Sequence, residues 1–177
     1  ANDKPMRHRI SAALPASIQE VAMHNGRQTS SKGNISELKV LTAYSAAGFV
    51  IAVPFGGGAP YDLIVDLGHR VLKIQVKTGR LRNGCVLFPM VRFSGHTGKG
   101  RPYDPGEFDY FAVYCPDNEK IYVLPLGNNP AQGYLRCEET KNRQQQKIHW
   151  AKDYEFEHHV RELRKAMELV GIEPTTS

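Results

Sequence analysis

A hairpin-like segment between residues 61 and 78 constrains the fold of this chain more than any other feature. Residues 61–66 are mostly apolar, and residues 71–78 alternate between apolar and polar side chains. The Leu67-Gly68-His69-Arg70 segment between them is short enough to turn the chain back on itself. Alternation with a period of two is typical of a strand with two unlike faces. The segment therefore predicts two antiparallel strands lying about 4.8 Å apart.

The second strand of this hairpin separates its apolar side chains from its polar ones. One face is expected to carry Leu72, Ile74 and Val76, and the other Lys73, Gln75 and Lys77. Asp62 lies on the first strand of the pair. If Asp62 faces the same way as Gln75 and Lys77, a carboxylate, an amide oxygen and an ammonium group meet at one place.

Helical patterns flank the strands. In the N-terminal arm, a short helix that stops at Asn25-Gly26 is predicted by Leu14, Ile18 and Val21. A second helix is expected from about Asn34 to Ala47, ended by Gly48. Its buried stripe would consist of Ile35, Leu38, Leu41 and Ala46. A last helix is expected over residues 153–170, with an apolar seam of Phe156, Val160, Leu163, Met167 and Val170.

The remaining apolar segments predict further strands. We expect them at residues 49–53, at residues 86–93 and in a hairpin of residues 108–115 and 120–126. Strands joined by tight turns favour an α/β (α+β) fold with a central mixed sheet flanked by helices. We expect an arm and short helix at residues 1–30, a main domain at 31–171 and a tail at 172–177.

The charge of the chain suits a polyanionic partner. There are 23 basic and 18 acidic residues, a net charge of +5. No acidic residue interrupts the segment from Lys77 to Arg101, whose glycines allow a backbone to approach a phosphate. An ordinary solvated loop is the alternative, and the polar stretch around residues 144–146 is equally well a connector. The candidate DNA-binding residues are Lys32, Arg80, Arg82, Arg92, Lys99, Arg101, Arg143 and Lys147.

Other sequence features narrow the classes of function. Three cysteines without a C-x-x-C pair argue against a disulfide framework and a zinc ribbon. No apolar run approaches the length of a membrane span, so we expect a cytoplasmic protein. The adjacent His158 and His159 diverge on a helix and make a poor chelate, so both are expected at the surface or facing a partner.

The polar residues of the hairpin match the needs of phosphodiester hydrolysis. A hard cation such as Mg²⁺, or Mn²⁺ in its place, prefers oxygen ligands, and Asp62, the Gln75 amide and the Val76 carbonyl can supply them. Lys77 can orient a water and offset charge on the phosphoryl oxygens. Glu37, on the preceding helix, can hold a second ion or a water. The alternative is that the lysines of this strand are ordinary solvated residues.

The segment from Lys32 to Gly79 resembles the PD-(D/E)XK nuclease superfamily. The order matches: Gly33 and Glu37 open a helix, a strand ends at Pro54, and the segments 61–65 and 74–78 follow. The branch of group I intron-encoded homing endonucleases is the most similar, and archaeal Holliday junction resolvases are next. The resemblance extends into residues 108–114 and towards 142–154.

The resemblance implies catalytic roles for Glu37, Asp62, Gln75 and Lys77 in a nuclease core. Gln75 departs from the superfamily pattern, in which an acid is usual, although the intron-encoded branch also has a glutamine there. The implied function is Mg²⁺-dependent, site-specific cleavage of double-stranded DNA by a homodimer or homotetramer. Structure-selective cleavage of junctions and a DNA-binding module that no longer cuts remain the alternatives.

Overall fold

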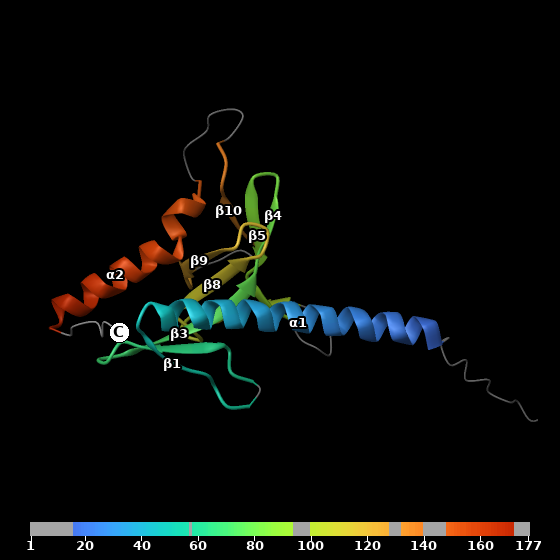
Figure 1. Cartoon of the computed structure of the whole chain (residues 1–177), viewed down its shortest axis with the longest axis horizontal. Helices are drawn as coiled ribbons and strands as arrows, with labels where there is room; N and C mark the ends of the chain where they lie inside the picture. Colours follow the sequence, from blue (N-terminus) through green and yellow to red (C-terminus); the bar gives the residue numbers. More distant parts are fainter. Residues whose placement is uncertain (1–15, 57, 94–99, 128–131, 140–147, 172–177) are drawn as a thin grey trace, which may run out of the picture. The chain divides into compact units, whose positions relative to one another are not determined.

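The computed structural model describes residues 16–56, 58–93, 100–127, 132–139 and 148–171, with side chains from Ser31 onward. The chain divides into two units, Ala1–Ser31 and Lys32–Ser177. In the first unit the structure describes only helical backbone, which begins at Ala16 (Figure 1). The side chains of the fold and of the candidate site belong to the second unit. The expected polar arm of residues 1–13 and the tail of residues 172–177 lie outside the described residues.

Helix α1 spans Ala16–Ala46 without interruption. The expectation of two helices separated by a stop at Asn25-Gly26 is therefore wrong. Glycine inside a helix costs only about 1 kcal/mol relative to alanine, which the rest of a long helix can absorb. The predicted end at Gly48 is confirmed: its φ is +87°, and its amide donates to the Ser45 carbonyl at 2.9 Å.

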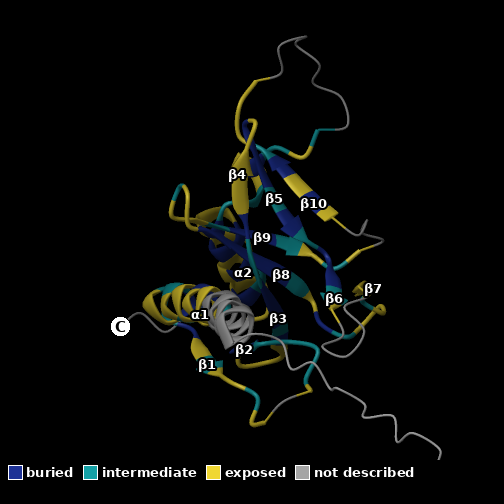
Figure 2. Ribbon diagram, turned by 90° about the vertical axis from the view of Figure 1, so that its right-hand side faces the viewer, coloured by how far each residue is buried: buried dark blue, intermediate teal, exposed yellow. Residues whose placement is uncertain are grey.

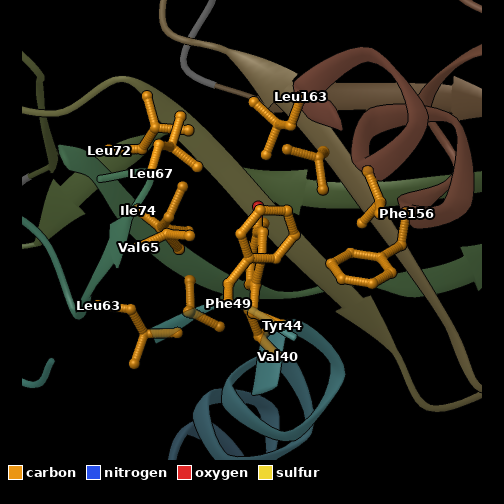
Figure 3. Packing of buried hydrophobic residues seen from close by; sticks show 14 of the residues in the cluster. Val40, Tyr44, Phe49, Leu63, Val65, Leu67, Leu72, Ile74, Phe156 and Leu163 are labelled. Atoms are coloured by element: carbon orange, nitrogen blue, oxygen red, sulfur yellow. The ribbon is translucent and has the colours of Figure 1, made fainter. Parts of the chain in front are cut away.

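The buried face of α1 differs from the predicted one. Ser36, Val40 and Tyr44, four residues apart, are fully or almost fully buried, whereas Ile35 and Leu38 are 51% and 63% exposed. Tyr44 anchors this face because its ring makes edge contacts with Phe49 and Phe156 (Figure 3). Two apolar stripes run along the helix in the sequence, and only tertiary packing selects between them.

A central mixed sheet forms the core, as predicted. In spatial order its strands are β1 (Val50–Ala52), β2 (Leu63–Asp66), β3 (Val71–Thr78), β8 (Tyr110–Cys115) and β9 (Lys120–Pro125). Strands β3 and β8 are parallel, and the other neighbours are antiparallel. The predicted turn after β2 is confirmed. The Gly68 amide donates to the Asp66 carboxylate at 2.8 Å, and the Leu67 backbone amide donates to the Arg70 carbonyl.

A second, three-stranded sheet was only partly predicted. Its order is β10 (Gln132–Arg136), β5 (Cys85–Pro89) and β4 (Arg80–Arg82), all antiparallel. A separate ribbon pairs β6 (Val91–Phe93) with β7 (Gly100–Pro102). The single strand expected at residues 86–93 is thus two strands, divided at Met90. Strands β4, β7 and β10 were expected as loops or connectors.

The central sheet is covered differently on its two faces. Side chains of α1 and of α2 (Phe156–Leu169) pack on the face that carries Leu72, Ile74 and Val76. The opposite face of β8 packs against Val86 and Phe88 of β5. Figure 2 shows the buried residues running through β5 and β8. A short 3-10 helix, Ala151–Tyr154, precedes α2.

The apolar seam of α2 belongs to this core. Phe156, Val160, Leu163 and Met167 are buried among residues of the same chain, whereas Val170 is 55% exposed. The seam is therefore not free to serve as a contact between subunits. Among the described residues, no helix combines the length and hydropathy that a membrane span requires.

Candidate active site

Asp62 and Gln75 face each other across the β2–β3 hairpin. Leu63 pairs with Ile74, so continuing the antiparallel register by one residue places Asp62 opposite Gln75. The Gln75 side-chain amide donates to Asp62 Oδ2, and the Val76 backbone amide donates to the same oxygen at 2.7 Å. Burial raises the pKa of the Asp62 carboxyl, although the Val76 amide, Lys77 and Gln75 oppose that shift.

Lys77 lies on the same face of β3, two residues further along. Its ammonium group donates to the Tyr103 hydroxyl at 2.7 Å and makes a longer contact of 3.4 Å with the Val91 carbonyl. Burial lowers the pKa of Lys77, and the nearby charge of Asp62 acts in the opposite direction. The ammonium is therefore held in a partly dry environment beside a carboxylate.

Glu37 comes to this site from α1. It is largely exposed, and partial burial followed by the charge of Asp62 raises the pKa of its carboxyl. The charge of Asp62 therefore acts on the Glu37 carboxyl in the same direction as its partial burial. The adjacent Ser36 fixes this part of α1, because its buried hydroxyl lies 2.7 Å from the Thr78 hydroxyl at the end of β3.

The oxygen ligands available at this site fit a hard cation that is bound with modest affinity. Two carboxylates that repel each other, the amide oxygen of Gln75 and the Val76 carbonyl are the kind of ligands that Mg²⁺ takes. The described residues contain no cluster of three or more His, Cys, Asp or Glu side chains, so a cation would have only the two carboxylates as charged ligands. Gln75 currently donates to Asp62, but turning its amide by 180° presents the oxygen instead.

The candidate DNA-binding residues fall into separate groups. Arg101 forms ion pairs with Asp104 at 2.7 Å and Glu107 at 3.0 Å, and Arg92 approaches Glu107 at 3.9 Å. Lys32, Arg80 and Arg82 line a hollow of about 440 Å³, and none of the three pairs with an acid in the part of the chain that the structure describes. Lys99, Arg143 and Lys147 lie outside the described residues.

Several residues of the site carry no signal in the sequence. Tyr103 lies in a stretch of Gly, Arg and Pro that suggests only a loop, yet its ring packs on Phe108 and Phe111 and its hydroxyl holds Lys77. Burial, followed by the charge of Asp62, raises the pKa of Tyr103 to about 12. Ser36 is likewise an ordinary helix residue in the sequence.

Two further polar residues support the fold. The Asp109 carboxylate accepts the Lys73 amide at 2.7 Å and so starts the parallel pairing of β3 with β8. His159 is not at the surface, as expected, but is only 9% exposed and packs edge-on against Tyr44 and Tyr110. His158 beside it is exposed.

Known proteins are similar to this chain. Among solved structures, the bacterial homing endonuclease I-Ssp6803I is similar with a TM-score of 0.62 and 24% identity, over 79% of this chain and 96% of that one. The Holliday junction resolvase Hjc of Archaeoglobus fulgidus is similar with a TM-score of 0.33 and 14% identity, over 55% of this chain and 84% of that one. The curated proteins contain no significant match.

The first of these structural similarities supports the fold. The family follows from a sequence match, because the model of the PD-(D/E)XK endonuclease family covers residues 27–157. This range includes Glu37, Asp62, Gln75 and Lys77 together with both sheets. The chain therefore belongs to the PD-(D/E)XK endonuclease family.

Proposed function

We propose that the protein is a metal-dependent endonuclease that hydrolyses phosphodiester bonds of double-stranded DNA at a defined site. The observation that carries this proposal is the convergence of Asp62, Gln75 and Lys77 on one face of the β2–β3 hairpin. The family match includes all three residues. We assign the nuclease domain to residues 31–171.

Asp62, Gln75, the Val76 carbonyl and Glu37 would hold the cation, Mg²⁺ or alternatively Mn²⁺. When bound, such an ion polarises the phosphate and makes a water a better nucleophile at neutral pH. The partly buried Asp62 carboxylate is already oriented for this role, because two donors hold its Oδ2. Glu37 of α1 would hold a water or a second ion.

Lys77 would act on the reacting phosphate directly. Its ammonium group is held by Tyr103 beside the Asp62 carboxylate, where it can orient the attacking water and offset the charge that develops on the phosphoryl oxygens. Such a donor is most effective in a partly buried site, where water screens its charge less. The same burial explains the lowered pKa of Lys77.

The substrate follows from charge and from the family. Lys32, Arg80 and Arg82 lie together without acidic partners among the described side chains, so they would contact backbone phosphates. A defined target site is proposed from the similarity to a homing endonuclease, which supports the fold but does not itself establish specificity. Cleaving both strands of a duplex calls for two sites, so we propose a homodimer or homotetramer.

Cleavage assays test this proposal. Supercoiled plasmid, random-sequence linear duplex and a four-way junction are incubated with the protein and Mg²⁺, Mn²⁺ or EDTA. We expect metal-dependent cutting that Lys77→Ala reduces by about a hundredfold or more while DNA binding persists. Lys165→Ala, which removes an exposed lysine of α2, is the matched control.

The outcomes separate the candidate functions. If the protein cuts only junctions, its substrate is branched DNA and not a duplex. If the protein binds DNA but cuts none of the substrates with either metal, it is a DNA-binding module on a nuclease scaffold. A Lys77→Ala variant that cuts at the parental rate would remove Lys77 from the proposed centre.

A further inference from the structure

A groove of about 640 Å³ lies beside the candidate active site. One wall is the outward face of the β4–β5–β10 sheet, and the β6–β7 ribbon contributes the other. In Figure 2 the β6–β7 ribbon is seen at the right, below β10 and β5. The residues that line this groove include Thr78, Arg80, Arg82, Leu87, Pro89 and Phe93.

The sheet places positive charge along one side of this groove. Arg80 pairs in register with Leu87, and Arg82 pairs with Cys85, so the two arginines project from the same face of β4. Both are exposed, and neither has an acidic partner within the described ranges. By contrast, Arg92 and Arg101 already engage Glu107. The free guanidinium groups on β4 therefore suit phosphates.

The rest of the groove is apolar. Phe93 is 61% exposed, and Leu87 and Pro89 of β5 line the floor. Gly100, paired with Phe93 across the ribbon, lets the β7 backbone approach closely, since a Cβ there would lie 2.9 Å from Val91 Cγ2 and 3.4 Å from Phe93 Cε1. An exposed aromatic ring beside free arginines is the usual combination for stacking a base while its phosphates are held.

The occupant that fits is an unpaired nucleotide rather than a duplex. In a duplex the flat faces of the bases are stacked on one another, so only sugars, phosphates and base edges reach the protein. An apolar wall gains little from those groups. An unpaired base exposes its flat face, and its stacking on Phe93 would remove apolar surface of both from water.

The groove lies next to the candidate active site. Thr78, which lines it, directly follows Lys77 on β3. Val91 also lines it, and the Val91 carbonyl is the second acceptor of the Lys77 ammonium, at 3.4 Å. A strand that occupied the groove would therefore pass beside the group that acts on the phosphate.

We propose that this groove binds unpaired nucleotides of a DNA strand next to the bond that is cut, with a base on Phe93 and phosphates on Arg80 and Arg82. The inference rests on the proposed nuclease function and adds that the strand is opened, or already unpaired, at that place. Leu87 and Pro89 complete the apolar floor. The duplex remains outside the groove.

Binding of tailed DNA in EDTA tests the groove without any cleavage. Three substrates share one sequence: a blunt duplex, the same duplex with a short unpaired 3′ tail, and one with a 5′ tail, each tail carrying 2-aminopurine. We expect one of the tailed duplexes to bind about tenfold more tightly than the blunt one, with quenching of 2-aminopurine fluorescence by stacking. Phe93→Ala should remove both effects, and Phe93→Tyr should retain them.

Phe55→Ala is the matched control, because Phe55 is a fully exposed phenylalanine that does not line the groove. Equal affinity for blunt and tailed DNA would overturn the proposal, as would an equal loss in Phe55→Ala and Phe93→Ala. Plasmid cleavage in Mg²⁺ is measured in parallel. Cutting without a tail preference rejects the groove alone, whereas a tail preference without cutting rejects the nuclease function alone.

Discussion

At the scale of single residues, the hydrogen bond from Gln75 to Asp62 bears on how strongly the site would bind a metal ion. A carboxylate at position 75 would repel Asp62, whereas the amide donates to it and keeps the pair together without a cation. An amide oxygen also binds Mg²⁺ more weakly than a carboxylate, because it brings no net charge. If the site holds a metal ion as proposed, Gln75 would lower both the need for that ion in the folded protein and the affinity for it.

Substitutions at Gln75 test whether its oxygen is a ligand. We expect Gln75→Ala to need roughly tenfold or more Mg²⁺ for half-maximal cleavage, and Gln75→Glu to need less than the parent. Gln75→Leu should be inactive although its volume is similar, because it offers no oxygen. Cleavage rate and Mn²⁺ affinity by calorimetry are measured against metal concentration. Parental metal dependence in Gln75→Leu would restrict the ligands to Asp62 and Glu37.

Tyr103 is predicted to position Lys77. In Tyr103→Phe the ammonium loses its 2.7 Å acceptor, a bond to a charged group worth about 1.5–3 kcal/mol, so the cleavage rate should fall roughly tenfold or more. Loss of that acceptor also lowers the pKa of Lys77 further, and the alkaline limb of the pH–rate profile should move to lower pH. Tyr134→Phe, which changes an exposed tyrosine, is the control. A lower rate with an unmoved profile would make the role of Tyr103 purely structural.

His159 makes the stability of the fold depend on pH. Burial, with the charge of His158, lowers its pKa from 6.5 to about 4, and the rings of Tyr44 and Tyr110 face it. Between these values the unfolded chain binds a proton that the folded chain does not. Stability should therefore decrease as the pH falls from 6.5 to about 4, by about 3 kcal/mol in total.

The substitution His159→Phe removes this titration. Urea unfolding of His159→Phe should show a weaker loss of stability between neutral pH and about pH 5 than the parent shows. His158→Phe, at the exposed neighbouring position, should keep the parental dependence. If His159→Phe and the parent lose stability equally over this range, His159 does not titrate with a depressed pKa.

At the scale of elements, the structure divides the arginines of the acid-free run into two kinds. Arg80 and Arg82 on β4 are available to phosphates, whereas Arg101 is held by Asp104 and Glu107. Each lost phosphate contact lowers the log–log salt slope of DNA binding by about one. We therefore expect this change for Arg80→Ala and Arg82→Ala, and a smaller one for Arg101→Ala. Equal slopes in all three variants and the parent would place β4 away from the DNA.

The elements that the sequence predicts are those with local signals. The hairpin of β2 and β3 and that of β8 and β9 follow from alternation and tight turns. The β4–β5 hairpin was not predicted although it too has a local signal, the Asn83-Gly84 pair, which takes φ angles of 50° and 67° in this turn. Strand β10 has no such signal, because its pairing with β5 is a contact between segments far apart in the sequence.

The same distinction applies to the candidate site. Asp62, Gln75 and Lys77 are predictable because strand register alone brings them together. Tyr103 and the Ser36–Thr78 link are not predictable, because each depends on how a distant segment packs on the end of β3. Helix α1 shows this most clearly: Ser36, Val40 and Tyr44 face the core, while the more apolar Ile35 and Leu38 do not.

At the scale of the whole molecule, the number of active sites decides how a duplex is cut. Each chain offers one set of Asp62, Gln75 and Lys77, and the two strands of a duplex run in opposite directions. Two copies related by a twofold axis would present one site to each strand. The contact between copies must then use a surface other than the α2 seam, which is buried within the chain.

The oligomer and the role of the α2 seam are tested together by light scattering and denaturant unfolding. The parent should have the mass of a dimer or tetramer at micromolar concentration. Leu163→Ala removes a side chain that is 4% exposed, so it should lower the free energy of unfolding by about 2–5 kcal/mol and leave the mass of the folded protein unchanged. Leu169→Ala, on the same helix but 87% exposed, should change neither quantity.

A monomeric parent, free and bound to DNA, would refute the proposed assembly. Burial of the α2 seam within one chain predicts a loss of stability without a loss of mass. A Leu163→Ala variant that stays folded but dissociates would therefore show that the seam forms part of the contact between subunits.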